Sequence, residues 1–168
     1  PELMTLKSVR LIRENRVIAL PGPAAAETVA YRIAVQAVPE LASKTLLSID
    51  MPMTHDQEIM NRGHERAARE IEEYLKQGEN VVLLTRGAPT IDSTFLSVQK
   101  RTPALGYGTE LVSGITSFCA AAARTGTPLA EWDEQLHILP AVHRLDSALD
   151  LRGNYVLMKS GRKMQEVK

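Results

Sequence analysis

Short apolar runs and longer amphipathic stretches alternate along the first two thirds of the chain. The short runs are typical of buried strands and lie at 16–21 ("RVIALP"), 44–50 ("KTLLSID"), 80–85 ("NVVLLT") and 109–113 ("TELVS"). Helical spacing of apolar residues predicts helices between them, over 1–15, 24–38, 54–77 and 93–101. Because strands and helices alternate, the pattern predicts a parallel α/β sheet with ligand loops at the carboxyl ends of its strands.

The helix ends carry recognisable signals. Thr54 is the expected N-cap of the longest helix, with Gln57 three residues later as in a capping box, and Gly78 supplies a left-handed stop. The first helix shows apolar residues at helical spacing, which predict its inward face: Leu3, Leu6, Val9 and Ile12.

The pattern changes after residue 114. A small-residue helix over 116–126 is followed by strands at 134–141 and 154–160, joined by the helical stretch 142–150, and a further helix begins at 161–168. Two strands cannot bury a sheet well by themselves. We therefore expect an N-terminal α/β lobe over 1–114 and an incomplete α/β C-terminal lobe over 115–168.

Composition narrows the class of protein. The 168 residues are 44% hydrophobic, and Lys plus Arg equals Asp plus Glu at 20 each, which argues against a general nucleic-acid or membrane-surface binder. No apolar run reaches the ~18 residues of a membrane span, and the first ten residues lack the features of a signal peptide. The only cysteine, Cys119, excludes an internal disulfide and is expected to be a buried, inert thiol. These features predict a soluble cytoplasmic protein.

Other familiar chemistries lack their motifs. The four histidines show no tight metal-ligand spacing, so we expect no metal site, and His64 is expected on a helix surface. Neither GxGxxG nor a P-loop is present, which disfavours nicotinamide and ATP as cofactors.

Several segments, taken in order, carry a family resemblance: "PELMTLKSVRLI", "DMPMT", "GAPTIDST", "SGITSFCAAAARTGTPLAE" and "LHILPA". The chain resembles the tetrapyrrole (corrin/porphyrin) methyltransferases, which use S-adenosylmethionine, over nearly all of its length. The pairing of "PMT" with a later "ST" makes it most similar to the C20-methyltransferases of cobalamin biosynthesis, which act on precorrin-2 or cobalt-factor II. The resemblance implies a two-lobed tetrapyrrole methylase fold with the cofactor between the lobes, and a homodimer. Compared with the family pattern, the sequence lacks the glycine-rich first strand and loop that precede "PEL", and it lacks the family's last strands.

The loop at 86–94 departs from the family pattern. Gly87-Ala88-Pro89 stands where the family has Gly-Asp-Pro, and Asp92-Ser93-Thr94 stands where it has Tyr-Ser-Thr. Arg86 stands where the family prefers a small or apolar residue. The resemblance therefore leaves three readings open: a C20-methyltransferase, a catalytically impaired or inactive fragment that still binds cofactor or tetrapyrrole, and a sister enzyme that methylates another position.

Site residues follow from the resemblance. Those expected to contact S-adenosylmethionine are Gly87, Ala88, Ile91, Thr116, Ser117, Leu139, Pro140, Ala141 and Met158. Those expected to contact the tetrapyrrole are Arg86, Ser93 and Thr94. Further cations are available for its carboxylates, although each is more typical of a solvated surface: Lys100, Arg101 and Arg144. Met158 also suits an ordinary strand core, and Pro140 and Ala141 also suit a strand-ending turn. Methyl transfer from a sulfonium needs positioning more than acid–base chemistry, so no catalytic side chain is assigned.

Overall fold

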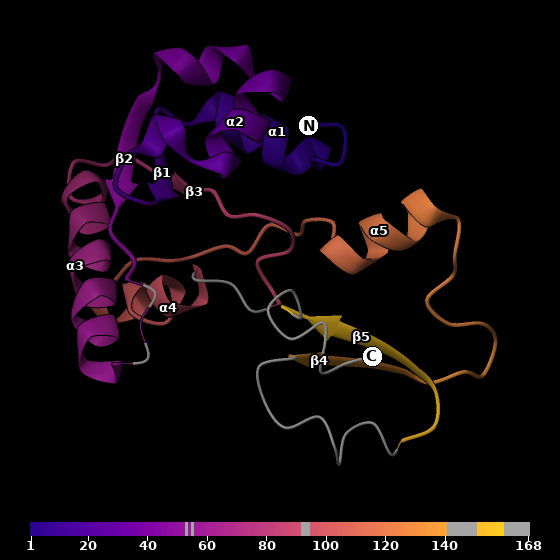
Figure 1. Cartoon of the computed structure of the whole chain (residues 1–168). Helices are drawn as coiled ribbons and strands as arrows, with labels where there is room; N and C mark the ends of the chain where they lie inside the picture. Colours follow the sequence, from indigo (N-terminus) through magenta and orange to yellow (C-terminus); the bar gives the residue numbers. More distant parts are fainter. Residues whose placement is uncertain (53, 55, 92–94, 141–150, 160–168) are drawn as a thin grey trace. The chain divides into compact units, whose positions relative to one another are not determined.

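The structure is a computed structural model that describes residues 1–168 except 53, 55, 92–94, 141–150 and 160–168 (Figure 1). The chain divides into two compact units, Pro1–Thr116 and Ser117–Lys168. The sequence analysis placed the boundary two residues earlier. Among the described residues, no helix is long and apolar enough to cross a membrane.

The first unit is built on three parallel strands in the order β2-β1-β3. They are β1 (Val17–Pro21), β2 (Thr45–Ile49) and β3 (Val81–Leu83). β1 is central, with Val17 opposite Thr45 on one side and Val81 on the other. The predicted parallel α/β sheet is confirmed.

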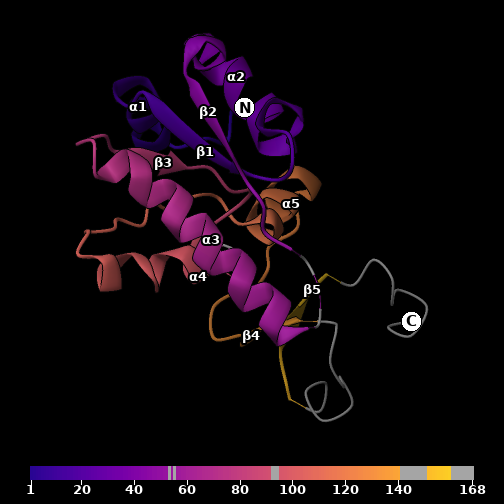
Figure 2. The same ribbon diagram turned by 90° about the vertical axis from the view of Figure 1, so that its left-hand side faces the viewer.

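Helices cover both faces of this sheet (Figures 1 and 2). One face packs against α1 (Leu6–Glu14) and α2 (Val29–Ala37), and the other against α3 (Gln57–Leu75) and α4 (Phe95–Gln99). Single turns of 3-10 helix complete the unit: η1 (Ala25–Glu27), η2 (Pro39–Ser43) and η3 (Thr102–Leu105). A strand covered on both faces needs apolar side chains throughout, and residues 17–20 of β1 are all fully buried.

Alternation along β1 divides the core into two clusters. Ile18 and Leu20 pack with Ile12 of α1 and Ala34 of α2, whereas Ala19 points to the other face and packs with α3. Each fully buried Leu or Ile contributes about 1.5–3 kcal/mol relative to an exposed position. The predicted inward face of the first helix is confirmed at Val9 and Ile12, which reach the core. It is wrong at Leu3 and Leu6, which are 62% and 88% exposed, and Met4, just before the helix, packs against the core instead.

Of the two signals predicted at the ends of α3, the N-cap is wrong and the glycine stop is confirmed. The predicted cap at Thr54 is wrong, since Asp56 is the N-cap and accepts hydrogen bonds from the backbone N–H of Glu58 (2.9 Å) and Ile59 (3.1 Å). A carboxylate at this position satisfies two free amides and suits the positive end of the helix dipole. The left-handed stop at Gly78 is confirmed by its φ of 80°.

The predicted strand at 109–113 is wrong. Among the residues that the structure describes, this segment has no ladder partner, and it is instead tied to the start of α1. The Lys7 ammonium pairs with the Glu110 carboxylate, and the Thr5 hydroxyl donates to the carbonyl of Ser113 (3.3 Å). These side-chain contacts fix the path of the chain toward residues 114–116.

The second unit holds α5 (Ser117–Thr125) and two parallel strands, β4 (Leu136–Pro140) and β5 (Asn154–Met158). α5 contains no buried residue, and Cys119 is exposed, so the prediction of a buried thiol is wrong. A tight turn before β4 carries the fully exposed Trp132, whose φ is 47°. The Glu134 carboxylate braces that turn by accepting from the backbone N–H of Glu131 (2.9 Å) and the side chain of Asn154 (2.8 Å). The predicted helical stretches 142–150 and 161–168 lie outside the described residues.

Candidate methyl-donor site

The sheet order creates a switch point at the carboxyl ends of β1 and β3. The chain leaves β1 for β2 on one side and later returns to β3 on the other side of β1. In parallel sheets, ligands bind outside the strand ends where the winding direction reverses, because the two connections diverge there. The loops at this edge are 22–24, 50–52 and the turn after β3.

The turn after β3 brings three expected site residues together. Leu84 still bonds to the β1 ladder through its N–H, which donates to the carbonyl of Ala19 (2.9 Å). Gly87 then adopts a φ of 72°, a conformation that favours glycine. Ala88 is 8% exposed, and its carbonyl accepts from the N–H of Ile91 (3.2 Å), which closes the turn.

Gly114 lies directly against this turn. A Cβ added to Gly114 would lie 2.2 Å from the carbonyl oxygen of Gly87 and 3.1 Å from its carbonyl carbon. Two backbone segments, 87–88 and 113–116, therefore approach each other closer than any side chain would allow. Sequence reasoning did not list Gly114 among the site residues, although the glycine in "SGITS" was the available signal.

Thr116 supplies the polar group beside this contact. Its hydroxyl oxygen is buried and, among the described residues, has no hydrogen-bond partner. A buried hydroxyl without a partner is unfavourable, so a ligand atom that bonds to it would be stabilising. Ser117, the next residue, is exposed and begins α5 as expected. An orphan hydroxyl two residues after Gly114 fits a ligand that carries hydrogen-bonding groups, as S-adenosylmethionine does.

In the second unit, two expected cofactor residues are neighbours. Pro140 and Met158 end their parallel strands as register partners, and Leu139 pairs with Leu157 one step earlier. The side chains of Leu139 and Met158 are half-buried. Ala141 lies outside the described residues.

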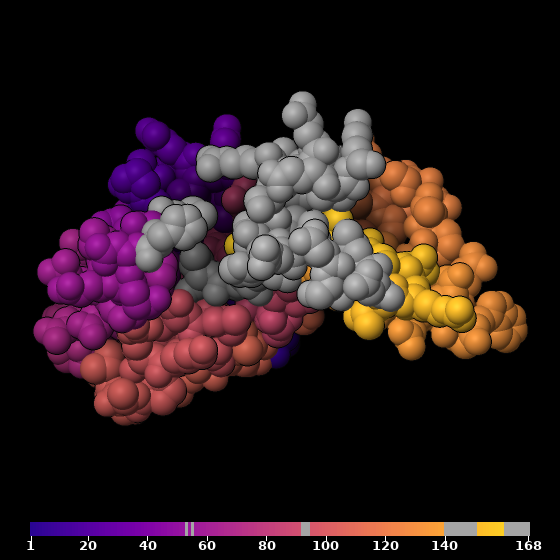
Figure 3. All heavy atoms as spheres, turned by 60° about the horizontal axis from the view of Figure 1, so that its bottom comes forward, coloured from indigo at the N-terminus to yellow at the C-terminus, as the bar shows by residue number. Residues whose placement is uncertain are grey.

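The cationic candidates differ in their surroundings. Arg86 and Lys100 are exposed. Arg101 is not a free surface residue, since its guanidinium donates to the carbonyl of Ser97 (2.7 Å) and to the side chain of Asn61 (3.1 Å) and so ties α4 to α3. Figure 3 shows the surfaces of these two segments, magenta and salmon, side by side. Ser93, Thr94, Asp92 and Arg144 lie outside the described residues.

His64 is buried, so its prediction as a surface residue is wrong. Burial lowers the pKa of His64, and the positive charge of Arg101 lowers it further. No group of three or more metal-ligating side chains occurs in the described part of the chain.

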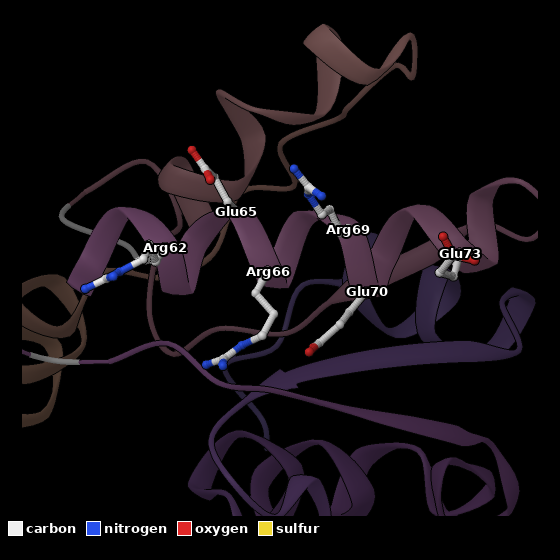
Figure 4. A pocket seen from close by; sticks show the side chains of 6 residues that line it. All are labelled: Arg62, Glu65, Arg66, Arg69, Glu70 and Glu73. Carbon is white, nitrogen blue, oxygen red and sulfur yellow. The ribbon is translucent and has the colours of Figure 1, made fainter. Parts of the chain in front are cut away.

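A shallow surface hollow of about 410 Å³ lies along the outward face of α3 (Figure 4). Its lining residues all come from this helix: Arg62, Glu65, Arg66, Arg69, Glu70 and Glu73. With three arginines and three glutamates, the lining has no charge excess that would select an anionic ligand. The hollow was not predicted from the sequence.

Comparison with known proteins identifies the fold that carries these features. The family model of the tetrapyrrole (corrin/porphyrin) methylases matches residues 1–168. The chain belongs to the tetrapyrrole methylase family. The expected family and its class of chemistry, methyl transfer, are thereby confirmed.

Individual relatives agree with this assignment. A Methanocaldococcus jannaschii protein named "Probable cobalt-precorrin-2 C(20)-methyltransferase" is 32% identical over 160 residues, covering 95% of this chain and 67% of its own length. The cobalamin biosynthesis protein CobIJ of Mycobacterium tuberculosis is 29% identical over 180 residues, and the match covers 100% of this chain but 35% of CobIJ.

Solved structures support the fold. CobF of Corynebacterium diphtheriae aligns with a TM-score of 0.71 at 20% identity, over 96% of this chain and 68% of CobF. The cobalt precorrin-4 methyltransferase CbiF aligns with a TM-score of 0.69 at 19% identity, over 99% and 67% of the two chains. The tetrapyrrole methylase fold expected from the sequence is thus confirmed.

Proposed function

We propose that this chain transfers the methyl group of S-adenosylmethionine to C20 of precorrin-2 or cobalt-factor II in cobalamin biosynthesis. The observation that carries the proposal is the close approach of Gly114 to the Gly87 turn, with the orphan hydroxyl of Thr116 two residues further along the chain. The C20 position is supported by the name of the M. jannaschii relative, which matches along most of this chain.

The residues of the first unit hold the cofactor in this proposal. Gly87 and Gly114 keep the edge free of side chains, so that backbone groups approach the ligand closely. The Thr116 hydroxyl bonds to a polar cofactor atom, and Ala88 and Ile91 supply apolar contact at the turn. In the second unit, Leu139, Pro140, Ala141 and Met158 provide further contacts, as does Ser117 at the start of α5.

When bound, the cofactor supplies an activated methyl group on a positively charged sulfur. The protein then needs to align the donor with the reacting carbon of the tetrapyrrole, since correct positioning can lower the barrier by about 7–11 kcal/mol. Arg86, exposed beside the turn, is proposed to bind a substrate carboxylate, together with the hydroxyls of Ser93 and Thr94. The methylated carbon then releases its proton to water, and we assign no general base.

Ala88 supports a second candidate, a binder without full activity. The position where the family places a carboxylate is here an alanine that is 8% exposed, so the chain lacks that charge at a nearly buried site. A sister enzyme that methylates another carbon is the third candidate. Only the choice of substrate distinguishes this third candidate from the C20-methyltransferase.

Two measurements test the proposal in order. Calorimetric titration with S-adenosylmethionine, and with its demethylated product, asks whether the chain binds the cofactor. Incubation with precorrin-2 or cobalt-factor II and a ¹³C-methyl donor, followed by NMR of the product, asks whether C20 gains the label. Binding without transfer would favour the impaired reading, and a label on another carbon would favour the sister enzyme. Failure to bind the donor would refute the proposal.

A cytoplasmic homodimer completes the proposal, following the family resemblance and the single cysteine. Analytical ultracentrifugation of the purified chain checks the oligomeric state.

A further inference from the structure

The segment after β2, residues 50–52, packs closely against α3. A Cβ added to Gly63 would lie 2.4 Å from Cδ and 2.6 Å from Cγ of Pro52. Real Cβ atoms do not approach ring carbons this closely, because carbon–carbon contacts are optimal at about 3.5–4.0 Å. Glycine at position 63 is therefore required for Pro52 to lie where it does.

A second tie lies one helical turn along α3. The guanidinium of Arg66 forms an ion pair with the carboxylate of Asp50, the first residue after β2. Residues three apart on a helix share a face, so Gly63 and Arg66 hold the same short segment. Figure 4 shows the Arg66 side chain turned away from those of Glu65 and Arg69.

The held segment, 50–52, belongs to the ligand edge. The carbonyl of Ile49, the last residue of β2, accepts from the N–H of Gly22 in the loop after β1 (2.8 Å). The proposed methyl-donor turn at Gly87 follows β3, on the other side of β1. Neighbouring strands lie about 4.8 Å apart, so two strand spacings place segment 50–52 roughly 10 Å from the β3 side of the edge.

The distance between segment 50–52 and the β3 side of the edge indicates which of the two ligands, donor or tetrapyrrole, the segment contacts. The donor site is built around Gly87, Gly114 and Thr116, beyond β3. A tetrapyrrole macrocycle with one meso carbon at the donor is broad enough to reach segment 50–52 when it lies along the edge past β1. We propose that Gly63 and Arg66 are positioning residues that fix segment 50–52 as a wall of the tetrapyrrole site. This inference rests on the proposed function and adds to it the residues that set how the macrocycle is seated.

The test is a steric variant with a built-in rescue. Gly63→Ala should displace Pro52 and lower kcat/KM for the tetrapyrrole by up to about 10²-fold, as expected for a misplacement of about 1 Å. The loss should lie mainly in KM, while calorimetric affinity for S-adenosylmethionine stays unchanged. Adding Pro52→Ala removes the two clashing carbons and should restore KM toward that of Pro52→Ala alone. Gly108→Ala is the matched control, since a Cβ there meets nothing within 4 Å.

A second variant avoids the risk that Gly63→Ala fails to fold. Arg66→Gln removes the ion pair without a clash and should raise the tetrapyrrole KM in the same direction, whereas Arg66→Lys should restore part of it. The inference is overturned if both Gly63→Ala and Arg66→Gln behave like the control, if the affinity for the donor falls in parallel with that for the tetrapyrrole, or if Pro52→Ala gives no rescue. A wild-type chain that neither binds nor methylates any tetrapyrrole would overturn the proposed function and this inference together, whereas an active wild-type chain with control-like variants would overturn the inference alone.

Discussion

Replacing Gly114 by alanine tests the proposed cofactor site most directly. The added methyl carbon would lie 2.2 Å from the carbonyl oxygen of Gly87 and 3.5 Å from the Cα of Ala88. The atoms that it meets belong to the backbone, so no side chain can rotate away. Either the 113–116 segment or the Gly87 turn has to move.

The size of the effect follows from this geometry. Ordinary carbon–oxygen contacts begin at about 3.3 Å, so the two segments must separate by about 1 Å. Overpacking of this kind costs about 1–3 kcal/mol of folding free energy. A shift of about 1 Å in a group that aligns reactants can lower the rate on the order of 10²-fold. Gly114→Ala should therefore lose donor affinity and methyl transfer by far more than its loss of stability explains.

Two assays separate these effects. Differential scanning calorimetry gives the stability cost, and titration with S-adenosylmethionine on the folded variant gives the affinity. Gly108→Ala, in open space, serves as the control. A Gly114→Ala chain that stays folded and binds the donor as well as the control does would refute the placement of the cofactor at this turn.

Three further predictions concern local features. Asp56→Ala should cost about 1 kcal/mol in urea unfolding, because two amides at the start of α3 lose their acceptor, while Thr54→Ala should cost less. His64 has a lowered pKa in the fold, so the unfolded chain binds its proton more readily as the pH falls below the ordinary value of 6.5; stability should then decrease with acidification, and His64→Gln should flatten urea-derived stability over that range. Cys119 should react with iodoacetamide in the native chain as fast as after denaturation, and a protected thiol would contradict its exposure.

Much of the first unit could be predicted because its signals are local. The run at β1 is apolar on both faces, as expected of a parallel strand covered by helices on each side, and those at β2 and β3 are short and mainly apolar. Gly78, three residues after α3, adopts the left-handed conformation that ends helices. The predictions that failed depend on tertiary context. "TELVS" has the composition of a strand, but Lys7 and Thr5 bind it through side chains instead of a ladder. Asp56 is the cap in place of the predicted Thr54, since sequence alone locates a helix start only to within a few residues.

Only part of the candidate site could be predicted from the sequence. Gly87, Ala88 and Ile91 were named through the family resemblance, and the turn that joins them is now described. Gly114 was missed because its role depends on contact with the backbone of Gly87, which lies 27 positions earlier in the chain. His64 was assigned to the surface because helical spacing alone reveals neither its burial nor the nearby charge of Arg101, which comes from a distant part of the sequence. Contacts between distant segments leave no local pattern.

The braced turn before β4 has a practical consequence. Trp132 is the only tryptophan of the chain and is fully exposed. Its fluorescence should resemble that of free indole in water and be quenched readily by iodide. Unfolding of the β1 core would leave this emission almost unchanged. Tryptophan fluorescence therefore cannot follow the thermal unfolding of the first unit.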